Sequence, residues 1–183
     1  MKIIYLKELT SSSWSGGITT QLFIFPFTAS YKAMNFDFRI SKATIEMETS
    51  TFSRLPGIQR TLMVLNGSLK LDHHGQRSLT LNQFESDCFQ GDWVTTSSGT
   101  ASDFNLMIRD SSLSGFLKHV RLKDSVDICF AAKGHGFIHI YQGTVLLDNK
   151  NELKAGDSIY FNLFDKIELK GKTKVDLILC FIE

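Results

Sequence analysis

The chain has 183 residues, and its hydrophobic fraction of 43% is sufficient for the core of one large domain or two small ones. Its 20 Lys and Arg residues balance 19 Asp and Glu residues, which argues against a nucleic-acid-binding protein because such proteins usually carry a basic excess. No segment approaches the roughly 20 apolar residues that span a bilayer, so no membrane partner is expected.

Short segments rich in β-branched and aromatic residues alternate with Gly, Ser, Asn and Asp turns along the whole chain, which is typical of an all-β fold. Residues 1–8 carry charges where a signal peptide needs an apolar run, and they are predicted to form a first strand. Residues 36–41 alternate with period two, with Phe and Ile on one side of the strand. A short helical turn is expected within residues 111–120, and residues 138–147 and 175–182 are predicted to form apolar strands.

An internal repeat organises the chain. Residues 60–72 and residues 136–148 both consist of a strand, a polar residue, Gly, a second strand and Asp, with Gly67 and Gly143 at the same place. Each copy is followed by a Gly-Asp turn and another strand. Because glycine permits the tight turn of a hairpin, each copy predicts a hairpin, and two such copies favour a duplicated domain.

This layout resembles a cupin repeat. The resemblance implies two cupin-like antiparallel β-barrels in one chain, a bicupin of the double-stranded β-helix or jelly-roll type, with the first barrel in residues 1–112 and a smaller second barrel in residues 113–183. Metal-binding cupins carry His and Glu ligands ahead of the repeat glycine, but the place of the Glu holds Arg60 in the first copy and Gly136 in the second. A metal site needs about three or four converging donors, so neither a metal nor another cofactor is expected.

Arg60 occupies a place that points into the barrel in cupins. A buried guanidinium needs an anionic partner, and its planar fork binds a carboxylate through two parallel hydrogen bonds. Two interpretations stay open: Arg60 binds a small acidic metabolite, or it forms a structural pair with an internal Asp or Glu.

Several motifs in the first two-thirds of the chain resemble the HutD/Ves family. They are the Trp, Gly-rich, Thr and Gln segment of residues 14–22, the Phe-Arg-Ile-Ser segment within residues 38–43, the distinctive Phe-Ser-x-x-Pro-Gly-x-x-Arg run of residues 52–60 and the Asp-Phe-Asn-x-Met run of residues 103–107. Ser15 is a departure, because it stands where the family often carries Asn. The resemblance implies a cupin-like protein with no established enzymatic activity, and the family is named after its association with histidine utilisation.

The same motifs supply the candidate ligand-binding residues. Alternation along a strand places Asp103 and Asn105 on one face. The candidates for a single cavity are Arg60, Arg39, Asp103, Asn105, Thr19, Gln21 and Trp14. Several have a structural alternative: turn capping for Asp103 and Asn105, core packing for Trp14 and a cross-strand ion pair for Arg39.

The cysteines and histidines point to no further chemistry. Cys88, Cys129 and Cys180 form no C-x-x-C pair, and their odd number fits unpaired buried thiols in a reducing compartment, so a cytoplasmic location is expected. His73 and His74 are predicted to lie in a solvated turn after a strand.

We therefore expect a metal-free bicupin that binds a small carboxylate metabolite, without catalysis, in a regulatory or sensing role linked to histidine utilisation. One alternative is a metal-independent isomerase or hydrolase, with Asp103 as the acid or base and Arg60 as the substrate clamp. Another is an interaction scaffold with a vestigial pocket. The expected partner is a small acidic metabolite rather than a nucleic acid or a membrane, and a homodimer is left open.

Overall fold

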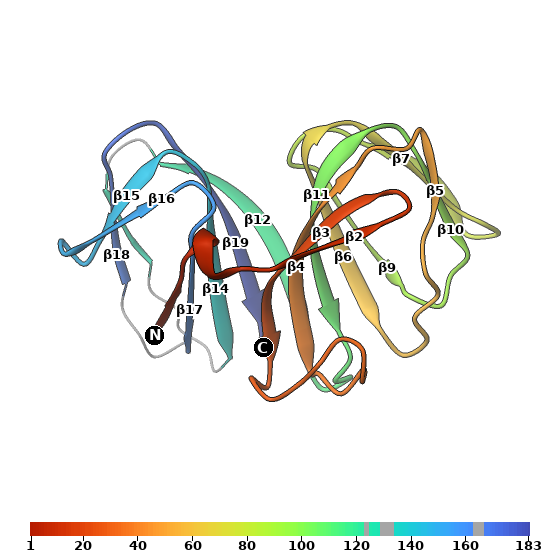
Figure 1. Cartoon of the computed structure of the whole chain (residues 1–183), viewed down its shortest axis with the longest axis horizontal. Coiled ribbons are helices and arrows are strands. Elements are labelled where there is room, and N and C mark those ends of the chain that lie inside the picture. Colours follow the sequence, from red (N-terminus) through yellow and green to blue (C-terminus); the bar gives the residue numbers. More distant parts are fainter. Residues whose placement is uncertain (123–124, 129–133, 163–166) are drawn as a thin grey trace. The chain divides into compact units, whose positions relative to one another are not determined.

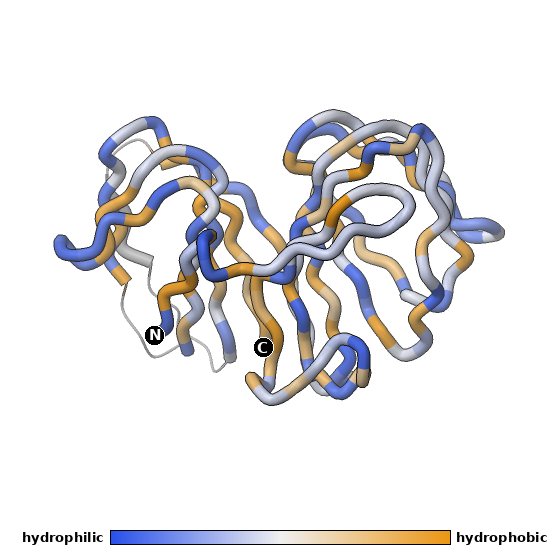
Figure 2. The backbone as a smooth tube through the Cα atoms, viewed as in Figure 1, coloured by the Kyte–Doolittle hydropathy of each residue, from blue (hydrophilic) through white to orange (hydrophobic). Residues whose placement is uncertain are grey.

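The computed structural model describes residues 1–122, 125–128, 134–162 and 167–183 (Figure 1). The described residues form strands joined by turns and loops, apart from one short 3₁₀ helix, η1, at Leu6–Glu8. This confirms the all-β prediction. None of the helical structure in these ranges is long and apolar enough to cross a membrane. Figure 2 shows hydrophobic residues along the strands and hydrophilic residues in most of the connecting turns.

The strands divide into two compact units, which we call the first unit (Thr10–Leu113) and the second unit (Met1–Leu9 together with Ser114–Glu183). The beginning of the chain belongs to the second unit because β1 (Lys2–Ile4) pairs antiparallel with β17 (Ser158–Asn162). The predicted division between residues 112 and 113 had placed the first nine residues in the first barrel, whereas in the structure they belong to the second unit. The Leu6 N–H also donates a hydrogen bond to Asp157 Oδ1, 151 positions away along the chain. Local sequence patterns do not predict contacts between residues that are so far apart.

The first unit consists of two antiparallel sheets. The six-stranded sheet has the order β2-β3-β4-β11-β6-β9 and contains β2 (Ser11–Trp14), β3 (Gly17–Phe25), β4 (Phe38–Ile45), β6 (Gln59–Gly67), β9 (Ser86–Gln90) and β11 (Ala101–Ile108). The four-stranded sheet has the order β5-β10-β7-β8 and contains β5 (Thr49–Thr51), β7 (Leu69–His73), β8 (Arg77–Leu81) and β10 (Thr95–Ser98). Leu62 on β6 and Leu71 on β7 belong to one buried apolar cluster, so the two sheets pack face to face.

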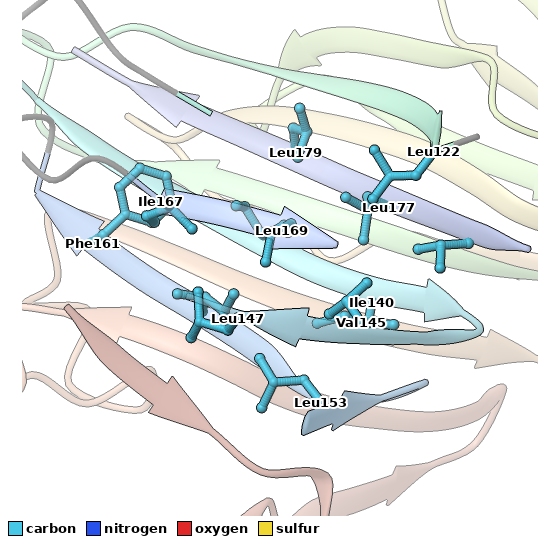
Figure 3. Close-up of a cluster of buried hydrophobic side chains, with 13 residues drawn as sticks. Leu122, Ile140, Val145, Leu147, Leu153, Phe161, Ile167, Leu169, Leu177 and Leu179 are labelled. Atoms are coloured by element: carbon cyan, nitrogen blue, oxygen red, sulfur yellow. The ribbon is translucent and has the colours of Figure 1, made fainter. Parts of the chain in front are cut away.

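The second unit repeats this arrangement. Its five-stranded sheet has the order β1-β17-β14-β19-β12, with β12 (Gly115–Leu122), β14 (His135–Gln142) and β19 (Val175–Ile182) beside the two strands named above. Its four-stranded sheet has the order β13-β18-β15-β16, with β13 (Ser125–Ile128), β15 (Thr144–Leu147), β16 (Asn151–Lys154) and β18 (Ile167–Gly171). Figure 3 shows how side chains of both sheets, such as Leu147 and Leu177, converge in one apolar core.

The structure differs from two predictions, the closed barrels and the helical turn. Within the described ranges, the strands of each unit form two open sheets, and their pairing closes no barrel. The helical turn expected within residues 111–120 reduces to a single turn in which the Leu113 N–H donates to the Asp110 carbonyl at 3.0 Å. The rest of that segment is strand, because β12 pairs with β19 from Gly115 opposite Ile182 to Leu122 opposite Val175.

The two repeat glycines lie at corners between sheets. The strands on either side of Gly67, β6 and β7, belong to different sheets, and so do β14 and β15 on either side of Gly143. The φ angles of the two glycines are +83° and +91°, in the region that favours glycine. The predicted hairpins are therefore wrong, because a strand-Gly-strand pattern indicates a sharp turn but does not reveal which strands pair.

Gly67→Ala is expected to lower the free energy of unfolding by about 1–3 kcal/mol, because it strains the left-handed backbone and crowds its surroundings. The added Cβ would lie 2.5 Å from the Thr100 carbonyl oxygen. Gly75→Ala is the matched control, since Gly75 has φ +75° but nothing within 4 Å of the added Cβ. Urea denaturation should show the smaller loss for the control, and equal losses would contradict the role of the close contact at Gly67.

Candidate functional site

One face of the six-stranded sheet carries charged and polar side chains. Met107 on β11 lies opposite Arg39 on β4 and opposite Arg60 on β6. Directly opposite residues point to the same face of a sheet, so the two arginines lie in one row on either side of Met107. Asn105 is two residues along β11, pairs with Ser41 and faces the same side.

These side chains line a cavity of about 730 Å³ within the first unit. Most of the candidate residues are in its lining, namely Trp14, Thr19, Arg39, Arg60, Asp103 and Asn105. Gln21 lies outside the lining and accepts a hydrogen bond from Arg39 Nε at 2.9 Å. The structure therefore brings the candidate residues from five strands of one sheet together, with Gln21 supporting Arg39.

Arg39 is held by neutral partners. Besides its bond to Gln21, its Nη1 donates to Ser41 Oγ at 3.1 Å, and its guanidinium lies 4.2 Å from the ring centroid of Tyr31. Burial lowers the pKa of the Arg39 guanidinium, while the nearby Tyr31 acts in the opposite direction. Among the described residues no carboxylate pairs with Arg39, so the cross-strand ion pair considered from the sequence is not observed.

Arg60 is also buried. Its Nη2 donates to Asn105 Oδ1 at 3.3 Å, whereas its Nε is buried and has no hydrogen-bond partner among the described residues. The guanidinium lies 4.8 Å from the ring centroid of Phe52 and 5.3 Å from that of Phe89. Burial lowers the pKa of Arg60 to about 10, even though the Asp103 carboxylate favours its charged form. Arg60 is therefore a buried cation whose Nε–H has no acceptor among the described residues.

Asp103 is a buried carboxyl next to this arginine. Its Oδ1 accepts a hydrogen bond from Asn105 Nδ2 at 3.4 Å, and the Asn105 amide in turn accepts from Arg60. Burial raises the pKa of Asp103 to about 6, and the Asn105 hydrogen bond and the Arg60 charge offset only part of this rise. Both Asp103 and Asn105 lie inside β11, so the turn-capping alternative does not apply.

Trp14 lies at the end of β2 and lines the cavity while 40% of its surface is exposed, which does not support core packing. Its ring lies over Gly16, where an added Cβ would come within 2.0 Å of the Trp14 ring. The Gly-rich segment after Trp14 therefore provides room for the indole.

Sequence reasoning missed several lining residues. Tyr31 comes from the loop between β3 and β4, and Phe52 and Ser53 follow β5. Phe52 and Ser53 belong to the Phe-Ser-x-x-Pro-Gly-x-x-Arg run, but neither was among the candidate residues. No sequence signal indicated Tyr31, because only the fold of its loop brings it over Arg39.

At the repeat position that matches Arg60, the second unit has a glycine in place of a charged side chain. Gly136, which matches Arg60 in the repeat, is buried, and a Cβ added there would lie 2.2 Å from the Phe161 ring. Phe161 belongs to the apolar core of that unit. Where the first unit has a guanidinium, the second has a packed aromatic ring.

His73 corrects the expectation of a solvated turn. It is buried, with Nδ1 2.8 Å from Thr95 Oγ1 and Nε2 2.9 Å from Asp87 Oδ2, and Asp87 also accepts a hydrogen bond from Arg77. His74, beside it, is exposed as expected.

The described residues contain no group of three or more His, Cys, Asp or Glu side chains that could hold a metal ion. Cys88 and Cys180 are free thiols, the first exposed and the second buried, whereas Cys129 lies outside the described residues. Burial of both thiols was the expectation, so Cys88 departs from it.

Comparisons with known proteins agree on the fold. A search of curated proteins found no match. A conserved protein of unknown function from Pseudomonas aeruginosa PAO1 is similar, with a TM-score of 0.85, 19% identity and coverage of 100% of this chain and 98% of the other. HutD from Pseudomonas fluorescens SBW25, in a formate condition, is similar with a TM-score of 0.75 and 18% identity, and the match covers 100% of this chain and 98% of the other. A cupin 2 conserved barrel domain protein from Leptotrichia buccalis is similar with a TM-score of 0.62 and 10% identity, and the match covers 100% of this chain and 96% of the other.

These structural similarities lie at low identity and show a shared cupin-like fold. The family comes from the sequence itself, because the HutD family model matches residues 6–179. This range contains both units almost completely, including every candidate residue of the cavity. The chain therefore belongs to the HutD family.

Proposed function

We propose that this protein is a metal-free bicupin that binds a small carboxylate metabolite in the cavity of its first unit. The observation that carries the proposal is the buried Arg60 guanidinium, whose Nε has no hydrogen-bond partner among the described residues. An unsatisfied buried donor costs about 1–3 kcal/mol, and a carboxylate on the free edge of the guanidinium would remove that cost.

The rest of the cavity supports an anionic ligand of small size. Arg39 adds a second positive charge in the same row, and both guanidinium groups are held by aromatic rings and neutral hydrogen-bond partners. Preorganised donors of this kind bind planar anions without a large ordering cost. Membership of the HutD family supports a regulatory or sensing role linked to histidine utilisation.

A thermal-shift experiment on the full chain tests the proposal, with formate, urocanate and N-formylglutamate as probes and formamide as the uncharged control. At a ligand concentration of about 100 times Kd, stability should rise by about 2.7 kcal/mol, or several degrees in Tm. Formamide should have little effect. If none of the carboxylates shifts Tm more than formamide does, the proposal is wrong.

One observation favours the alternative of a metal-independent isomerase or hydrolase. Burial raises the pKa of Asp103 to about 6, close to the range in which a carboxyl transfers protons effectively at neutral pH. Turnover of a bound carboxylate, followed by NMR, would identify the enzyme, whereas binding without conversion favours the sensor. The open cavity of about 730 Å³ gives no support to a scaffold with a filled pocket.

A further inference from the structure

Asp103 is the only carboxyl among the cavity-lining residues that the structure describes. The charged and titratable groups that share the lining with it are Arg39 from β4, Arg60 from β6 and Tyr31 from the loop before β4. On the remaining side of the first unit, Asp87 of β9 is already bound by His73 and Arg77. The lining residues of β2, β3 and β5 are not titratable.

The contact between Arg60 and Asp103 runs through the Asn105 amide. Arg60 Nη2 donates to Asn105 Oδ1, and Asn105 Nδ2 donates to Asp103 Oδ1, so the carboxyl is close to the cation without a direct ion pair. A carboxylate that bound to the free edge of Arg60 would bring a second negative charge into the same buried space. Two carboxylates that share a desolvated site do not both stay ionised, because their repulsion raises the pKa of one of them strongly.

We infer that the cavity takes up one proton with each carboxylate that it binds above neutral pH, and that Asp103 accepts this proton. This inference rests on the proposed function. The neutral Asp103 carboxyl then donates its O–H toward the bound anion or a neighbouring acceptor, and both arginines are left to neutralise the ligand. A short O–H···O⁻ hydrogen bond is among the stronger neutral-to-ion contacts in proteins. The protein would therefore respond to the concentration of the carboxylate and to pH together.

The sign of the pH dependence follows from the state of Asp103. Burial raises the pKa of Asp103 to about 6 in the free protein, and a bound anion raises it further. As the pH falls below 6 the carboxyl becomes protonated before the ligand binds, so binding takes up progressively less of a proton and the affinity approaches its highest value. Above pH 6 the proton must come from solution, and the Kd should rise by up to about tenfold per pH unit, the limit for linkage to one proton.

The test uses formate, which stays ionised throughout the range, at pH values from 5.5 to 8. Isothermal titration calorimetry in two buffers that differ in ionisation enthalpy measures the protons taken up per formate bound. For the natural chain we expect uptake that approaches one proton above pH 7 and a Kd that increases with pH. Asp103→Asn places a permanently neutral group at the same position, so its Kd should be independent of pH and lower than that of the natural chain at pH 8.

The outcomes separate this inference from the proposed function. If formate binds with the same Kd at every pH and without proton uptake, the proton linkage is wrong while carboxylate binding stands. If Asp103→Asn keeps the full pH dependence, another group accepts the proton and the assignment to Asp103 fails. If formate binds at no pH, the proposed function itself fails, and the linkage fails with it.

Discussion

Arg60→Met should weaken the binding of a carboxylate by about ten- to a hundredfold, because the variant loses a charge-assisted contact that is typically worth about 1.5–3 kcal/mol. Met fills much of the same space but offers no donor. The measurement is the Kd of formate or of the strongest carboxylate in the thermal-shift panel, determined by calorimetry at pH 5.5, where Asp103 is largely neutral in both proteins.

The same variant should leave the stability of the ligand-free protein nearly unchanged, or raise it. Arg60 carries a desolvated charge with an unpaired Nε, and its single hydrogen bond goes to the neutral Asn105. Replacing an incompletely satisfied buried charge by an apolar side chain is often neutral or stabilising. Asp103 would lose a nearby cation, but its pKa is already raised by burial, so it becomes neutral at little cost. A loss of several kcal/mol in ligand-free urea denaturation would instead show that Arg60 holds the first unit together.

Arg77→Met is the matched control. Arg77 also belongs to the first unit and binds a buried carboxylate, Asp87, but it does not line the cavity. This variant should retain carboxylate binding and lose stability, the reverse of the pattern expected for Arg60→Met. Equal patterns for the two variants would contradict the distinct role that we assign to Arg60.

Asp87→Ala should lower the free energy of unfolding by about 3 kcal/mol, in the range seen when one partner of a buried ion pair is removed. Asp87 Oδ2 lies 2.9 Å from Nε2 of the buried His73, and Oδ1 accepts a hydrogen bond from Arg77. The variant would leave a buried imidazole without one of its two partners. The loss should fall at the low end of the range, because the Arg77 side chain is 44% exposed and water replaces part of its contact.

Asp72→Ala provides a comparison at an exposed carboxylate next to His73 on β7. Asp72 lies 3.5 Å from His74, and the two side chains are 48% and 51% exposed. Exposed pairs contribute about 0–1 kcal/mol, so this variant should change the stability very little. Urea denaturation of both variants at pH 7 measures the difference, and a loss for Asp87→Ala no larger than that for Asp72→Ala would contradict the structural role of the buried network.

The all-β fold, the repeat and most of the residues that line the cavity could be predicted from the amino-acid sequence. Period-two alternation on β4 placed Arg39 and Ser41 on the face opposite Phe38 and Ile40, as the structure confirms by the register with Asn105 and Met107. The alternation is a local property of strands, so it can be read without knowing which strands pair. The resemblance to a cupin repeat, in which the place of Arg60 points inward, implied a buried arginine, and Arg60 is buried in the structure.

The way in which these strands pair and pack could not be predicted from local sequence patterns. The repeat glycines turn the chain between two sheets, and β1 joins a sheet made from the other end of the chain, because strand pairing depends on contacts between distant residues. Contacts between distant residues also explain why Tyr31 lines the cavity and why His73 is buried. The balance of charges in the cavity is also a tertiary property: desolvation raises the pKa of Asp103 and lowers that of Arg60, and the extent of desolvation is set by the sheets that pack around them.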